Sequence, residues 1–140
     1  MGKINWGRVI LGGLLAGVVI NIVEYVVHGK MLEGDWNAAL TALNRPAISG
    51  SAVAWFVFSG FLVGIGMVWL YAAIRPRYGA GPRTAICAGI GAWFFVVLVY
   101  VIGQYPLHLW PTRLLAIGAV VGFFEYAVAG LAGGWAYKEA

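Results

Sequence analysis

Four long apolar stretches, separated by short polar segments, constrain this chain more than any other feature of its sequence. An α-helix needs about 20 mostly apolar residues to cross the hydrocarbon core of a bilayer. The pattern predicts spanning helices at residues 6–28, 51–74, 83–104 and 112–137. Backbone polar groups in hydrocarbon must be satisfied within their own segment, so the predicted fold class is all-α, an integral membrane four-helix bundle.

The composition is that of a membrane protein and not of a soluble one. Hydrophobic residues make up 62% of the 140 residues and charged residues 10%, whereas soluble domains average about 45–50% and about 25%. We therefore expect one transmembrane domain over residues 1–140, with the lipid bilayer as its partner. The first apolar run lacks a small-residue cleavage motif, so we interpret it as a retained helix and not as a signal peptide.

Lysine and arginine residues are distributed unequally between the two ends of the predicted bundle. Six of them fall at one end: Lys3, Arg8, Arg75, Arg77, Arg83 and Lys138. Three fall at the other end: Lys30, Arg45 and Arg113. Because Lys and Arg in short loops favour the cytoplasmic side, we predict that both termini are cytoplasmic in a bacterial-type inner (plasma) membrane. No predicted helix carries a basic stripe, so a nucleic-acid partner is not expected.

The loop between the first two spans has a helical pattern of its own. Trp36, Ala39, Leu40 and Leu43 recur at helical spacing, and Asp35 can cap a helix that starts at Trp36. We predict a short amphipathic helix that lies on the outer surface of the membrane or over the mouth of the bundle. It would serve either as a plain connector with an interfacial tryptophan or as a lid.

Small residues recur at a spacing of four in every predicted span. The pairs are Gly13/Gly17, Gly60/Gly64, Ala85/Gly89, Gly118/Gly122 and Gly130/Gly134. Such pairs allow helix backbones to approach closely in lipid. We expect them to build a tight bundle, and they leave open a homo-oligomer or a larger membrane complex.

The first predicted helix carries a polar face in an otherwise apolar run. Asn21, Glu24, Tyr25 and His28 lie at i, i+3, i+4 and i+7, which places them on one side of a helix. A carboxylate inside a membrane is costly and persists mainly where it faces protein, water or a partner. This face is therefore the first candidate for function.

The last predicted helix repeats the spacing of the first. Gly118, Glu125, Tyr126 and Gly130 correspond in spacing to Gly17, Glu24, Tyr25 and Gly29. The match indicates either an internal repeat of inverted topology or a coincidence in a chain rich in glycine and valine.

If the first and last helices are neighbours, their polar faces converge on one pocket. The predicted ligand- or proton-binding residues are Glu24, Glu125, Asn21, Tyr25 and Tyr126. His28 and His108 are predicted at the outer rim of this pocket.

Three functions remain open for the predicted pocket. Its carboxyl groups could tie helices together in a structural or accessory subunit. They could instead carry a proton or a cation in transport. Glu24, His28 and Glu125 are also candidate metal ligands, although the chain has only two histidines and no HExxH motif. No cofactor is firmly implied, and no nucleophile–base pair points to an enzyme.

The layout resembles a group of small uncharacterised bacterial four-helix inner-membrane proteins of unknown function. The resemblance depends on four motifs: Glu24-Tyr-x-x-His28-Gly29, Asp35-Trp36, Trp69-Leu-Tyr-x-x-x-Arg75-Pro-Arg77 and Glu125-Tyr126. The resemblance covers nearly the whole chain and implies no activity. Small multidrug transporters are similar in having four helices with a glutamate in the first, but their other motifs are missing from this sequence.

Overall fold

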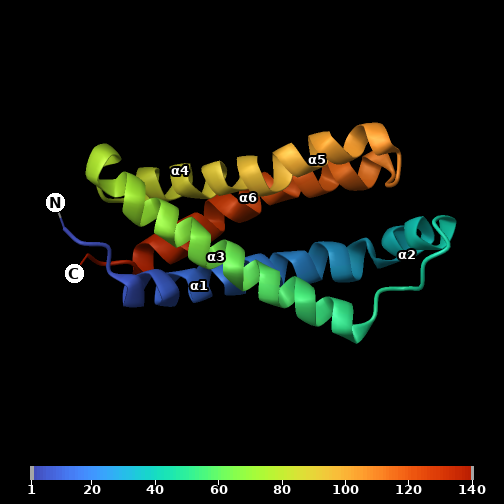
Figure 1. The fold of residues 1–140 in the computed structure, drawn as a ribbon, viewed down its shortest axis with the longest axis horizontal. Helices are drawn as coiled ribbons and strands as arrows, with labels where there is room; N and C mark the ends of the chain where they lie inside the picture. The colour runs from blue at the N-terminus through green and yellow to red at the C-terminus, as the bar shows by residue number, and fades with distance from the viewer. Residues whose placement is uncertain (1, 140) are drawn as a thin grey trace.

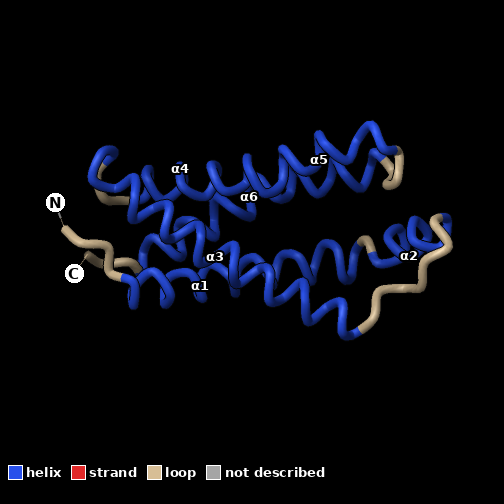
Figure 2. Tube along the Cα trace, viewed as in Figure 1, coloured by secondary structure: helices blue, strands red, loops and turns tan. Residues whose placement is uncertain are grey.

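The computed structural model describes residues 2–139, which form four long helices and a short one (Figure 2). The long helices cover Trp6–Met31, Gly50–Tyr78, Pro82–Leu107 and Thr112–Ala136. Each of them is long and apolar enough to cross a membrane. The all-α fold class and the four apolar spans predicted from the sequence are therefore confirmed.

The first long helix changes its winding near its end. It consists of α1 (Trp6–Val26) followed by a π-helical turn at Val27–Met31. The second and fourth long helices, α3 (Gly50–Tyr78) and α6 (Thr112–Ala136), are α-helical throughout.

The third long helix is interrupted in its middle. It begins as α4 (Pro82–Trp93), passes through a π-helical segment at Phe94–Leu98, and continues as α5 (Val99–Gln104). A 3₁₀ turn at Tyr105–Leu107 ends it. An inserted π turn rotates the side chains that follow it about the helix axis, and such turns occur frequently at functional sites.

The loop after the first long helix contains α2 (Glu33–Ala42). This helix begins earlier than the predicted start at Trp36, and Asp35 lies in its first turn instead of capping it. Carboxylates in a first turn complement the positive end of the helix dipole. Glu33 and Asp35 together therefore explain the earlier start.

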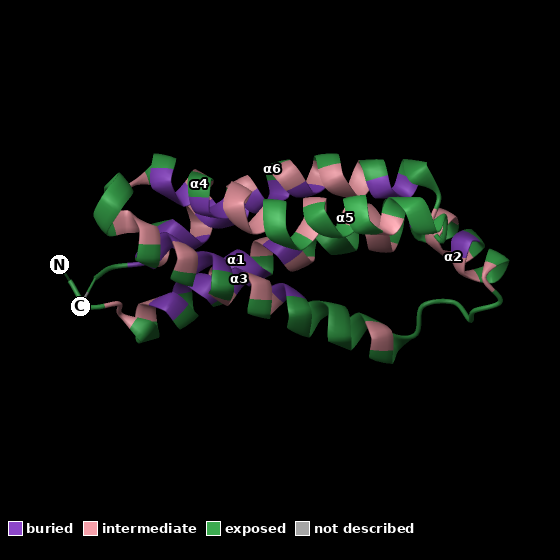
Figure 3. Cartoon of the chain, turned by 45° about the horizontal axis from the view of Figure 1, so that its top comes forward, coloured by how far each residue is buried: buried purple, intermediate pink, exposed green. Residues whose placement is uncertain are grey.

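The two termini lie at one end of the molecule, and α2 lies at the other (Figure 1). We call these the terminal end and the α2 end. α1 packs against α3, α4 packs against α6, and contacts between α1 and α6 join the two pairs. At the terminal end Val9, Val68, Ala88 and Ala129 belong to one buried apolar core. Toward the α2 end the helices are more exposed (Figure 3), and residues 53–58 of α3 are all exposed.

Glycine is required at helix crossings where backbones touch, and two of them show this clearly. A Cβ atom on Gly64 of α3 would collide with the backbone of Gly13 and Gly17 in α1. A Cβ atom on Gly89 of α4 would collide with the backbone carbonyl of Tyr126 in α6. Small residues allow this approach between helices in lipid. The predicted packing role is thus confirmed where α1 meets α3 and where α4 meets α6.

α2 folds back onto the beginning of α6. Leu32, Ala39 and Leu114 form a small buried cluster at this contact. The ring of Trp36 packs edge-on against that of Trp110, with their centroids 5.5 Å apart. The contact holds α2 beside the candidate site.

Candidate functional site

Glu125 in α6 is a carboxyl group buried among apolar helices, with 4% of its surface exposed. Neither of its oxygens has a hydrogen-bond partner among residues 2–139. The carboxyl group of Glu24 in α1 lies close enough to interact with it. The Glu24 side chain is itself 49% exposed. The fold therefore brings together the two carboxyl groups singled out in the sequence, one of them buried and the other accessible.

A cavity of about 170 Å³ opens beside Glu24. Its wall comes from the first, third and fourth long helices and from α2. The lining residues are Glu24, His28, Trp36, Val96, Val97, Tyr100, Val101, Leu114, Leu115, Gly118 and Gly122. Glu125 follows Gly122 on α6 by about one helical turn. It does not line the cavity itself, and Glu24 is the wall residue whose carboxyl group interacts with it.

Gly118 and Gly122 keep this cavity open. A Cβ atom on Gly118 would lie 3.7 Å from the His28 ring, and one on Gly122 would lie 3.3 Å from Trp93. The sequence predicted a close helix crossing for this pair, as for the others. That prediction is wrong for Gly118 and Gly122, because the neighbouring His28 and Trp93 side chains face the two glycines in place of a second backbone.

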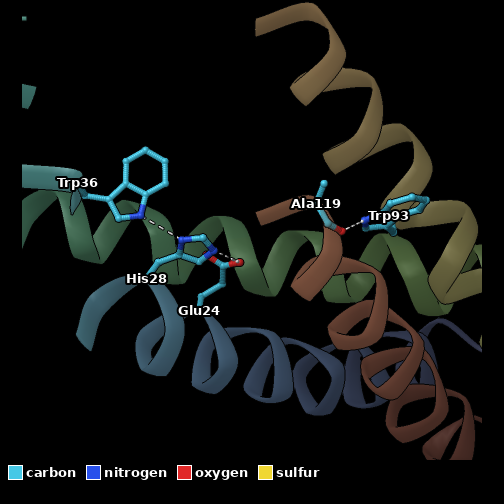
Figure 4. A network of polar contacts seen from close by, with 5 residues as sticks. All are labelled: Glu24, His28, Trp36, Trp93 and Ala119. Atoms are coloured by element: carbon cyan, nitrogen blue, oxygen red, sulfur yellow. Dashed lines mark hydrogen bonds and ion pairs between the residues drawn. The ribbon is translucent and has the colours of Figure 1, made fainter. Parts of the chain in front are cut away.

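His28 connects Glu24 with α2 (Figure 4). Its Nδ1 atom accepts a hydrogen bond from Trp36 Nε1 at 3.1 Å, and its Nε2 atom lies 3.9 Å from Glu24 Oε1. An indole N–H can only donate, so Nδ1 carries no proton and the neutral imidazole carries its proton on Nε2, facing Glu24. His28 therefore belongs to the cavity wall and not to an outer rim.

Both π-helical segments border the cavity. The first contains His28, and the second contains Val96 and Val97. Because each segment departs from the 3.6-residue period, the side chains after it point in directions that a regular helical pattern does not predict.

Two predicted members of the site lie on other sides of α1. Asn21 Nδ2 donates to the Val57 carbonyl of α3 at 3.2 Å. Tyr25 is 57% exposed, and the Lys30 ammonium lies 5.4 Å from the centre of its ring. With about 100° of rotation per residue, Glu24 is about 60° from Asn21 and about 100° from Tyr25 around the helix. The prediction that all three face one pocket is therefore wrong.

Tyr126 and His108 are not part of the cavity wall. Tyr126 is buried in the core of the bundle next to Gly89 of α4, close enough to Glu125 and Glu24 to interact with both carboxyl groups. His108 is exposed and lines a separate depression of about 500 Å³ between α2 and the beginning of α6. The two histidines therefore do not rim one pocket. Tyr25 is exposed and Tyr126 is buried. The sequence spacing that the first and last helices share therefore does not place equivalent residues in equivalent environments.

The candidate metal ligands do not form a metal-binding group. Nowhere in residues 2–139 do three His, Cys, Asp or Glu side chains come together as a metal site would require. Of the candidates, Glu24 and His28 are neighbours, and the Nδ1 atom of His28 is occupied by Trp36.

Sequence reasoning missed three contributors to the site. Gly118 was visible as part of a small-residue pair, and Trp36 as part of a short helix, but neither pattern indicated a cavity. Tyr100 gives no sequence signal, because it follows the π-helical segment at Phe94–Leu98.

No protein-family model, curated protein or solved structure matches this chain.

Proposed function

We propose that this chain is a small inner-membrane transport or ligand-binding module in which Glu24 and Glu125 together bind a proton or a cation. One observation carries the proposal. The Glu125 carboxyl group is buried without a hydrogen-bond partner in the described chain, and it lies beside the accessible carboxyl group of Glu24 at the cavity.

The free energy of the pair supports a functional role. A carboxylate at the centre of a spanning helix costs about 2.5–3.5 kcal/mol on insertion scales. Two neighbouring carboxylates also repel each other, so they require a proton or a cation to compensate their charge. Glu24 can receive this positive charge from the cavity, and Glu125 can take it further into the bundle.

The excess of Lys and Arg at the terminal end supports an orientation with that end in the cytoplasm. The α2 end then faces the outside, and the cavity beside Glu24 is reached from there. The core that contains Val9, Val68 and Ala129 closes the cytoplasmic half. In an alternating transport cycle, this conformation would be the one open to the outside.

The alternative, a structural subunit in which the glutamates tie helices together, has less support. A structural tie needs a bond across the interface, such as the one that Trp93 Nε1 donates to the Ala119 carbonyl at 2.9 Å. Within residues 2–139, neither oxygen of Glu125 has a hydrogen-bond partner, and the group it meets across the interface is the Glu24 carboxyl group, which repels it unless a proton or a cation compensates their charge.

The proposal is tested with purified protein in lipid vesicles that enclose a pH-sensitive dye. The vesicles are loaded with Na⁺, K⁺ or tetramethylammonium, so that outward movement of a cation can be followed by proton entry. We expect acidification by the wild-type protein with at least one of these cations. Glu24→Gln and Glu125→Gln should reduce acidification to the level of protein-free vesicles, because each removes one carboxyl group of the pair.

Glu33→Gln is the matched control, because Glu33 is an exposed carboxylate on α2 outside the cavity wall. It should retain the wild-type rate. Acidification that persists in Glu24→Gln and Glu125→Gln would remove the pair from the transport mechanism, and wild-type vesicles that behave like empty ones would refute transport.

A further inference from the structure

We infer that the cavity binds a small organic monocation, with an ammonium group directed at Glu24, the member of the glutamate pair that lines the wall, and an apolar body of about the size of a benzene ring. This inference rests on the proposed function, since it takes the glutamate pair as the element that recognises positive charge. It adds the chemical class of the ligand, which the rest of the cavity wall specifies.

The charge around the cavity selects a cation. Within the described chain, Glu24 is the one carboxylate in the wall, and no Lys or Arg side chain belongs to it. The nearby basic residues are engaged elsewhere: Arg113 donates to Asp35 at 3.1 Å, and Lys30 lies over the ring of Tyr25. An anionic ligand would meet repulsion from both glutamates, and a neutral one would leave their charge uncompensated.

The apolar part of the wall selects an organic ligand over a bare metal ion. Val96, Val97, Val101, Leu114 and Leu115 offer hydrocarbon and no ligand atoms. A small hard cation needs about six oxygen ligands to replace its water. An ammonium group attached to an apolar body needs one charged partner and a hydrophobic surface, and the cavity offers both.

The volume limits the size of this ligand. The cavity measures about 170 Å³, close to the roughly 150 Å³ of an engineered protein cavity that admits benzene. Pockets for drug-sized molecules are larger, about 300–1,000 Å³. An apolar body of about six to seven non-hydrogen atoms therefore fits the cavity, with the ammonium group at Glu24 on its wall.

Two aromatic side chains complete the recognition surface. Trp36 and Tyr100 face the cavity from opposite segments of the chain, α2 and α5. The faces of such rings attract an ammonium group, and the attraction increases where water is excluded. The Trp36 indole N–H is already bonded to His28, so its ring is held in place without a ligand.

Calorimetric titration of the purified protein in detergent tests the inference. The probe is benzylamine, which is protonated at neutral pH, and benzyl alcohol is its neutral counterpart of equal size. We expect saturable binding of benzylamine and binding of benzyl alcohol that is weaker by about tenfold or more, because a charge-assisted contact is lost. Glu125→Gln should weaken benzylamine binding by a similar factor, and Glu33→Gln should leave it unchanged.

A second pair of variants tests the cavity itself without altering its charge. Gly118→Leu places a side chain into the space next to His28 and should abolish benzylamine binding. Val120→Leu is its matched control, because Val120 lies on the same helix with 61% of its surface exposed. Circular dichroism and thermal unfolding verify that both variants fold.

The outcomes separate the ligand class from the proposed function. Equal binding of benzyl alcohol, no binding of benzylamine, or tighter binding of Na⁺, K⁺ or Zn²⁺ would overturn the organic monocation, while the vesicle result on Glu24→Gln and Glu125→Gln would stand. Benzylamine binding without any proton movement would uphold the ligand class and refute transport.

The ammonium group could belong to a free amine or to a lipid headgroup. Titration of the protein in nanodiscs of phosphatidylglycerol, with and without phosphatidylethanolamine, distinguishes these sources. If the affinity for benzylamine is the same with and without phosphatidylethanolamine, the ligand is a free amine, as the volume of the cavity favours. If phosphatidylethanolamine weakens benzylamine binding, the ammonium group belongs to the lipid.

Discussion

Glu125 combines deep burial with a carboxyl group that no neighbouring side chain within residues 2–139 satisfies. Proteins retain such unfavourable groups where function requires them, at a cost in stability. A structural side chain in the same position would be expected to stabilise the fold. The sign of the stability change on removing Glu125 therefore distinguishes the two roles.

Replacement of Glu125 by methionine removes the carboxyl group and leaves a side chain of similar length. We expect the free energy of unfolding to rise by about 1–3 kcal/mol, because a buried polar group with a desolvation cost gives way to an apolar one. Thermal or detergent-induced unfolding measures the change. Glu33→Met, at an exposed position, should shift stability by less than about 0.5 kcal/mol. A destabilised Glu125→Met protein would assign this side chain a structural role.

At the scale of the helical elements, glycines serve two purposes. Gly13, Gly17 and Gly64 permit contact between backbones, whereas Gly118 and Gly122 maintain empty space. The spacing is the same in both cases. What differs is the partner, because a glycine pair opposite another small residue allows close packing, and one opposite large side chains leaves a cavity.

Gly64→Ala tests the first purpose. The added methyl group would collide with the α1 backbone, so we expect the free energy of unfolding to fall by about 1–3 kcal/mol. Gly66→Ala on the same helix is the control, since nothing lies within 4 Å of its Cβ position. That variant should be unchanged or more stable by up to about 1 kcal/mol. Equal effects of the two substitutions would contradict the crossing of α1 and α3 at Gly64.

The short helix α2 is held over the cavity by few contacts. Trp36 donates to His28, and Arg113 pairs with Asp35 at 3.1 Å with both side chains largely in contact with solvent. Exposed ion pairs contribute about 0–1 kcal/mol, so the hydrogen bond to His28 and the packing of Trp36 against the buried cluster of Leu32, Ala39 and Leu114 carry most of the attachment.

Trp36→Phe removes the donor and retains an aromatic ring. We expect the amide hydrogens of α2 to exchange about five- to tenfold faster, because a hydrogen bond worth about 1 kcal/mol is lost. Hydrogen exchange followed by mass spectrometry reports this for the peptide that covers Glu33–Ala42. Trp55→Phe, at a position that is 70% exposed on α3, should leave α2 unaffected. Unchanged exchange in Trp36→Phe would show that His28 does not hold α2.

At the scale of the whole molecule, the proposed orientation makes a prediction about labelling. In a Cys87→Ser background, Ala47→Cys lies in the exposed loop at the α2 end and Lys138→Cys at the terminal end. A membrane-impermeant maleimide should label Cys at position 47 in intact cells and at position 138 only after the membrane is opened. The reverse pattern, or equal labelling of both, would refute cytoplasmic termini.

The spans could be predicted because their apolar length is itself the physical requirement for crossing a bilayer. The interruptions at Val27–Met31 and Phe94–Leu98 could not, because a π-helical turn leaves no mark on an apolar run. Their consequence is the altered direction of the side chains that line the cavity.

The candidate site was predictable only in part, for a similar reason. A helical stripe indicates that Asn21, Glu24 and Tyr25 share one side of α1, but it does not indicate which neighbour each side chain meets. Glu24 faces α6, Asn21 faces α3, and Tyr25 is exposed. The convergence of Glu24 with Glu125 was predicted on the condition that the first and last helices are neighbours, and α1 does pack against α6.

The close packing of α3 at the terminal end and its exposure at the α2 end have a mechanical consequence. A helix of the length of α3 extends about 40 Å, and one half of it is anchored by tight packing while the other is free of such contacts. A rotation of about 5° about the anchored half would displace the tip of the free half, about 20 Å away, by about 2 Å. A change too small to disturb the close glycine contacts is thereby enlarged at the α2 end. The exposed half of α3 can thus move while the backbone crossings remain intact.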